Sequence, residues 1–69
     1  MTSVPLSRIL LLIQREYEEQ PGLRLTPFQA QRLWGLDMST CTTALAALVD
    51  VGKLQLTTDG RFAIRQAAP

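Results

Sequence analysis

Hydrophobic residues in the first third of the chain recur at intervals of three and four positions, the spacing of one side of an α-helix. The pattern predicts a helix from about residue 5 to residue 20, which Pro21 and Gly22 would end. Ser3 or one of its neighbours would begin this helix, with Pro5 early in it. The residues on its apolar side, which we expect to face the core, are Leu6, Ile9, Leu10, Ile13 and Tyr17.

A short extended segment at residues 23–25 precedes a second helix, which we predict over residues 27–34. Thr26 followed by Pro27 is typical of a helix start, because the threonine side chain accepts from a free backbone N–H and proline fits the first helical position. Gly35 is typical of a helix end. The residues expected to face the core are Phe28 and Leu33, together with Ala30 or Trp34.

A third helix is predicted over residues 38–51, and either Asp37 or Ser39 would cap its start. Its expected core residues are Cys41, Ala44, Leu45 and Leu48, with Val49 and Val51 at the margins. The opposite side of this helix carries small and hydroxyl side chains at helical spacing. These are Ser39, Thr43, Ala46 and Asp50, flanked by Thr42 and Ala47.

Strict alternation replaces the helical spacing after Gly52 and predicts a β-hairpin with strands at about 53–57 and 61–65. Asp59 and Gly60 would supply a positive-φ turn between the strands. Leucines at 54 and 56 and apolar residues at 62 and 64 alternate with polar or small ones. Because a short two-stranded hairpin is marginal alone, it should pack on the helices, so that residues 1–65 form one domain and residues 66–69 a loose tail.

The composition is that of a small folded domain with no strong overall charge. The chain has 69 residues, 46% of them hydrophobic, with seven basic and six acidic side chains and a net charge of +1. Disorder is not expected at this hydrophobic content, and 69 residues are near the lower size limit for one apolar core. A net charge this small gives no overall attraction to nucleic acid or anionic lipid, so any such binding needs a local patch.

The residues that metal sites and enzymes need are scarce. There is one cysteine and no histidine, which excludes an internal disulfide and argues against a metal. Cys41 lies on the expected core side of its helix, so we interpret it as a buried, unreactive thiol. No nucleophile with a base, paired acids or phosphate-binding glycine loop is evident. We therefore expect neither an enzyme nor a cofactor.

The longest apolar run, residues 9–13, is far too short to span a bilayer. Charged residues follow it directly and no small-residue cleavage site does, so a signal peptide is also not expected. The sequence favours a cytoplasmic protein with no membrane partner.

The order of predicted elements resembles that of the winged helix-turn-helix family, over residues 6–65. The similarity lies in residues 25–30 at the start of the second helix, 33–37 across the turn and 45–54 entering the hairpin, with residues 58–62 as the wing. It looks most like small bacterial members of the family. The resemblance implies an α+β fold, mainly α, of three helices and a hairpin, in which the third helix enters the DNA major groove and the wing contacts the backbone.

The resemblance also implies which residues would contact double-stranded DNA. Those on the third helix would be Ser39, Thr40, Thr42 and Thr43, and those elsewhere Arg32, Lys53, Arg61 and Arg65. Hydroxyl groups can bond phosphates and base edges. The implied function is a small transcription regulator.

A second function stays open because residues 37–52 contain no basic side chain, whereas phosphate contacts dominate the affinity for DNA. Small side chains let another helix approach closely, and the first helix carries more apolar surface than the core of a small domain needs. The candidate interface residues are Leu11, Leu12, Ala46, Ala47 and Asp50. The alternative is therefore a protein-interaction module, with a homodimer as one form of it.

Overall fold

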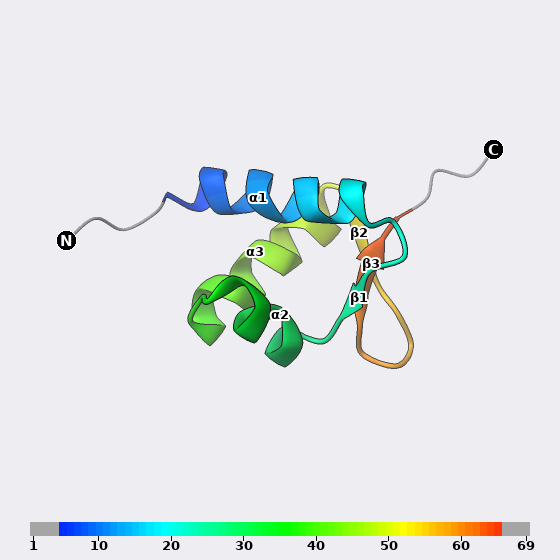
Figure 1. Cartoon of the computed structure of the whole chain (residues 1–69). Helices are drawn as coiled ribbons and strands as arrows, with labels where there is room; N and C mark the ends of the chain where they lie inside the picture. The colour runs from blue at the N-terminus through cyan, green and yellow to red at the C-terminus, as the bar shows by residue number, and fades with distance from the viewer. Residues whose placement is uncertain (1–4, 66–69) are drawn as a thin grey trace.

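The computed structural model describes residues 5–65 and has three helices and a small antiparallel sheet (Figure 1). Its elements in chain order are α1 (Leu6–Glu19), β1 (Arg24–Leu25), α2 (Pro27–Trp34), α3 (Met38–Asp50), β2 (Leu54–Leu56) and β3 (Phe62–Ile64). The predicted α+β fold class is confirmed, and the helices and hairpin strands end within one residue of their predicted bounds. The predicted cap at Ser3 and the predicted tail at 66–69 lie outside the described residues.

The sheet has three strands in the order β1-β3-β2, so the extended segment before α2 joins the predicted hairpin. Leu25 and Leu56 both pair with Phe62, and these three side chains share the face that meets the helices. Arg24 and Gln55 both pair with Ala63 on the opposite face. The third strand gives the hairpin the extra support that an isolated pair lacks.

The turn between β2 and β3 differs from the predicted one. Gly60 has a φ of 83°, but no residue other than glycine has a positive φ within residues 5–65, so Asp59 does not share the left-handed conformation. The Thr57 N–H donates to the Arg61 carbonyl at 2.7 Å and the Gly60 N–H to the Thr57 carbonyl at 3.0 Å. The loop therefore has three residues and places one glycine in the left-handed region, a common alternative to the two-residue turn.

The core lies between the three helices and β2. Its buried residues are Ile9, Ile13, Tyr17, Ala30, Cys41, Ala44, Leu45, Leu48 and Leu54. The Tyr17 hydroxyl donates to the Phe62 carbonyl at 2.7 Å and so ties α1 to β3. The predicted core side of α1 is correct except at Leu6, which is 41% exposed in the first turn of the helix.

The prediction of which α2 residues face the core was wrong at two positions. Phe28 is 59% exposed and Leu33 55% exposed, while Ala30 is fully buried and Trp34 half-buried. Ala30 and Trp34 are four residues apart and lie on one side of the helix, whereas Phe28 lies about 200° from Ala30. Alanine lets α2 approach α3 closely, and that orientation turns both larger side chains outward.

Val51, predicted at the margin of the core, and the hairpin residue Leu56 are both exposed. Val51 is 68% exposed because it follows the last turn of α3 instead of belonging to it. Leu56 is 57% exposed although it lies on the helix-facing side of the sheet, because it stands at the end of β2 nearest the wing loop.

Candidate functional site

The outer side of α3 carries the small and hydroxyl side chains that its sequence predicts. Exposed residues on this side are Ser39, Thr42, Thr43, Ala46 and Asp50, and Ala47 is half-buried. This surface holds no positive charge, since residues 37–52 contain no basic side chain.

Two of the hydroxyl groups are already used within the helix. The Thr40 hydroxyl donates to an Asp37 carboxylate oxygen at 2.6 Å, and the Thr40 N–H donates to the other oxygen at 3.0 Å. The Thr42 hydroxyl donates to the Met38 carbonyl at 2.8 Å, a bond that competes with outside partners. Within residues 5–65, Ser39 and Thr43 make no side-chain hydrogen bond and stay available.

Asp37, not Ser39, caps α3. Its side-chain and backbone hydrogen bonds from Thr40 lower the pKa of the carboxyl, which is fully exposed. A negative charge therefore stands at the helix N-terminus, where it complements the helix dipole and would oppose a DNA phosphate.

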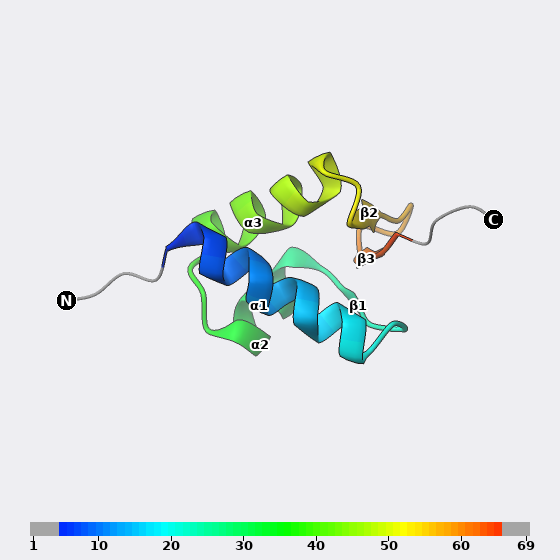
Figure 2. The same ribbon diagram turned by 90° about the horizontal axis from the view of Figure 1, so that it is seen from above.

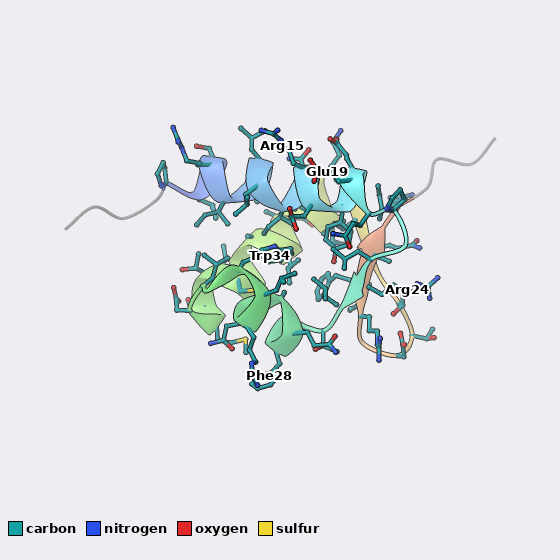
Figure 3. All side chains as sticks on the ribbon, viewed as in Figure 1. Arg15, Glu19, Arg24, Phe28 and Trp34 are labelled. Carbon is teal, nitrogen blue, oxygen red and sulfur yellow. The ribbon has the colours of Figure 1, made fainter. Side chains whose placement is uncertain are left out.

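The positive charges lie on the sheet. We call its outward side the basic face, and its residues are Arg24, Lys53, Gln55, Arg61, Ala63 and Arg65. Arg24 and Gln55 flank the small Ala63, which lies at the centre of this face. Figure 3 shows Arg24 extending from the sheet away from the helices. The face thus has four cations around Ala63, whose own surface is only 6% exposed.

Alternation along β3 places two arginines on this face. Arg61 and Arg65 each stand two residues from Ala63, and the ladder continues past both ends of the strand. The Thr57 N–H donates to the Arg61 carbonyl at 2.7 Å, and the Arg65 N–H donates to the Lys53 carbonyl at 3.0 Å.

One acid balances the cations at the wing tip. The Thr57 hydroxyl donates to the Asp59 carboxylate and lowers its pKa most, and Arg61 and Arg24 lower it further. The Arg61 Nε lies 3.5 Å from a carboxylate oxygen of Asp59, and both side chains are exposed. This pair holds Arg61 against the loop, whereas Arg24, Lys53 and Arg65 form no ion pair within residues 5–65.

Lys53 and Arg65 meet where α3 passes into β2. The Lys53 N–H donates to the Leu48 carbonyl at 2.9 Å, which ends the helix. The Arg65 guanidinium lies beside Gly52, where a Cβ would be 3.6 Å from its Nη1. The Arg65 guanidinium therefore stands at the negative end of the α3 dipole, a favourable place for a cation.

The structure thus divides the eight predicted DNA-contacting residues among three places. Lys53, Arg61 and Arg65 share the basic face, and the four hydroxyl residues lie in the first half of α3. Figure 2 shows the sheet beside the C-terminal end of α3, with the N-terminal end of that helix far from it. Arg32 lies on α2, with its guanidinium 5.9 Å from the centre of the Phe28 ring.

Sequence reasoning missed Arg24 as a member of the basic face. The available signal was its position between two leucines in an extended segment, since alternation turns the middle residue away from the core. What the sequence did not disclose is that this segment pairs with β3 and so places Arg24 beside Ala63.

Two apolar surfaces are exposed besides the basic face. Leu11 and Leu12 lie on the outer side of α1, and the former is 59% exposed, as the interface prediction requires. Phe28 and Leu33 on α2 border a second shallow depression, together with Leu25. The second surface was not predicted, because both residues were expected in the core.

The described residues hold little reactive chemistry. Residues 5–65 contain no cluster of three or more potential metal ligands, and none of their helices is long and apolar enough to cross a membrane. Cys41 is fully buried, as expected, and burial raises the pKa of its thiol. Trp34 packs against Tyr17, with ring centres 6.4 Å apart.

Comparison of the chain with protein-family models, curated protein sequences and solved structures gave no significant match in any of the three. The functional argument therefore rests on the surfaces of the molecule itself.

Proposed function

We propose that this chain is a small DNA-binding protein of the winged-helix type, which acts as a bacterial transcription regulator in the cytoplasm. The observation that supports the proposal best is the basic face, on which four cations share one side of a three-stranded sheet and, among residues 5–65, only Arg61 is in an ion pair. The element order, in which two helices lead into a wing, also fits this type of protein.

The charges favour the sheet over α3 as the surface that holds the DNA backbone. Phosphate contacts supply most of the binding free energy, and only cations or N–H donors make strong ones. Asp37 and Asp50 stand at the two ends of α3, so a phosphate close to either end would be repelled. Ser39 and Thr43 remain as uncharged groups that contact bases or phosphates beside the sheet.

The number of cations sets the expected salt dependence. If Arg24, Lys53 and Arg65 each neutralise one phosphate, the logarithm of the binding constant should fall with the logarithm of salt concentration with a slope of about −3. Arg61 contributes less, because Asp59 already pairs with it. Affinity from one domain is then modest and is best measured at low salt.

The test is a titration of fluorescent duplex DNA of mixed sequence with the full chain at several salt concentrations. Lys53→Ala and Arg24→Ala should each weaken binding and reduce the magnitude of the slope by about 1. Arg32→Ala is the matched control: the resemblance implied a DNA contact for Arg32, but this arginine lies on α2 beside Phe28 and is not part of the basic face proposed here. It should leave the slope unchanged.

Two results would contradict the proposal. One is the absence of any binding at low salt by a chain shown to be folded. The other is an equal loss of affinity in Arg32→Ala and Arg24→Ala, which would mean that overall charge and not the basic face governs binding.

A protein-interaction module is the second candidate, and the exposure of Phe28 and Leu33 favours it. Phenylalanine and arginine are both enriched in protein interfaces, and here the Arg32 guanidinium lies 5.9 Å from the centre of the Phe28 ring. If a protein binds there, Phe28→Ser should abolish its capture by the immobilised chain while Leu56→Ser, an exposed apolar residue on the sheet, should not. Equal capture by both variants would count against this surface.

A further inference from the structure

The outer side of α1 has two adjacent leucines in the middle of a charged surface. Leu11 is 59% exposed and Leu12 46% exposed. They line a shallow open depression that runs along the helix. Its charged lining residues are Arg8, Arg15, Glu16 and Glu19. Figure 3 shows Arg15 and Glu19 on the side of α1 that faces away from α2 and α3.

The charges on the ridge of α1 that passes through Leu12 are separated along the helix. Arg8 stands four residues before Leu12 and Glu16 four residues after it, so the three side chains follow one ridge of α1. Among residues 5–65, the only ion pair is the one between Arg61 and Asp59, so Arg8 and Glu16 have no ionic partner within that part of the chain. The ridge is therefore positive at one end, apolar in the middle and negative at the other end.

We propose that α1 packs antiparallel against α1 of a second copy of this chain, with the two-fold axis at Leu12. Reversing the direction of the second helix brings its Glu16 opposite Arg8 of the first, and the symmetry repeats this pair on the other side of the axis. The two Leu12 side chains meet at the centre, with Leu11 beside them. A parallel arrangement would place Arg8 opposite Arg8, so the charges select the antiparallel one.

The dimer is expected to be weak, because one helix of 14 residues covers a small interface. Interfaces below about 1,200 Å² in total belong to transient complexes. We therefore expect a dissociation constant in the micromolar range or above. The pairing requires neither DNA nor the basic face, so it holds whether or not the chain binds DNA.

Sedimentation equilibrium of the full chain from about 1 µM to about 1 mM brackets this affinity range. The mass should rise from the monomer value of 7.7 kDa towards twice that value as the concentration increases. Leu12→Glu should stay monomeric throughout. Ala46→Arg is the control, since it places a charge on the exposed side of α3 and should dimerise like the unmodified chain.

A charge exchange tests the orientation. Arg8→Glu and Glu16→Arg should each prevent dimerisation, because like charges then face each other. The double variant should dimerise again, and an equimolar mixture of the two single variants should form a mixed dimer. Helical circular dichroism equal to that of the unmodified chain establishes that each variant is folded.

A monomeric mass at every concentration would overturn the proposal, as would a double variant that stays monomeric while folded. Loss of the dimer in Ala46→Arg alone would place the contact on α3 instead. Failure to bind DNA changes none of these masses, so the two proposals fail independently.

Discussion

The two long helices and the short one reach their positions in different ways. α1 and α3 have 14 and 13 residues and bury a continuous row of side chains, with Ile13 and Leu45 fully inaccessible. α2 has eight residues and fully buries only Ala30. The packing of buried side chains therefore holds the two long helices in place, whereas the short helix needs another source of stability.

That source lies at the ends of α2. The Thr26 side chain accepts from the Gln29 N–H, and the Gln29 side chain accepts from the Thr26 N–H, which is a complete capping box. Pro27 fills the first helical position, and Gly35 ends the helix with a φ of 65°. A helix fixed at both ends can leave its large side chains free for another molecule.

The largest predicted effect is the difference in stability loss between a leucine-to-alanine substitution in a long helix and the same substitution in the short helix. Leu45→Ala, in the core part of α3, should lower the free energy of unfolding by about 2 to 5 kcal/mol, because it leaves a cavity. Leu33→Ala, at a 55% exposed position of α2, should cost less than about 1 kcal/mol. Urea unfolding followed by circular dichroism measures both.

Similar costs at the two positions would mean that Leu33 packs inward in solution and that the contrast between the helices is wrong. A domain of this size has little stability to spare. If Leu45→Ala does not fold, Leu45→Val provides a smaller cavity at the same site.

The next effect concerns the hydrogen bond that joins α1 to the sheet. Tyr17→Phe removes the hydroxyl that donates to the Phe62 carbonyl and should cost about 1 to 2 kcal/mol. This is more than an exposed position on α2 should cost, and less than a cavity. No loss of stability would show that water replaces the bond easily.

The same residue gives a pH dependence with a definite sign. Burial raises the pKa of Tyr17 from 10.0 to about 12. In that range the unfolded chain loses the phenolic proton and the folded chain keeps it, so stability is fully present below pH 10 and falls as the pH rises to about 12. Tyr17→Phe should flatten this decline in urea midpoints measured from pH 9 to 12, and an unchanged slope would contradict it.

The sequence predicted the buried residues of the two long helices better than those of the short helix, and the difference in helix length explains why. In α1 and α3, several turns repeat the spacing, and the buried sets Ile9, Ile13, Tyr17 and Cys41, Ala44, Leu45, Leu48 were predicted fully. α2 has only about two turns, so the spacing of its apolar residues does not define which side of the helix faces the core. The size of Phe28 and Leu33 suggested that these side chains are buried, but in the structure the small Ala30 is buried instead. Side-chain size indicates burial poorly where a helix must approach its neighbour closely.

The candidate site was predictable only in part, for a related reason. The alternation of side chains along a single strand indicated from the sequence that Arg61 and Arg65 point outward. Arg24 belongs to the basic face because it pairs with Ala63 in β3, and 38 residues separate the two along the chain. Hydroxyl groups of α3 could be recognised, but the bond between Thr40 and Asp37 that removes one of them required the conformation of the cap.

A smaller effect is expected at the ends of α2. Thr26→Ala removes the cap and should cost about 1 kcal/mol. Gly35→Ala should cost about as much, for the positive φ alone, because a Cβ there would meet nothing within 4 Å. Both should exceed the cost of Leu33→Ala in the middle of the helix. The opposite order would show that α2 is held by its side after all.

The smallest effect tests the cap of α3, a helix that its buried side already holds. Hydrogen bonds from Thr40 lower the pKa of Asp37 below its usual 3.8, so the carboxylate stabilises the fold above that pH. The contribution is lost as the pH falls through the lowered pKa, because the folded chain must then take up the proton. Asp37→Asn should shift the urea midpoint slightly downward at pH 7, and this difference from the unmodified chain should shrink as the pH falls through the lowered pKa of Asp37. Asp50→Asn, at the other end of α3, should not lower the midpoint at pH 7, since a negative charge there opposes the helix dipole. Equal losses in the two variants at pH 7 would mean that net charge, and not the cap, is responsible.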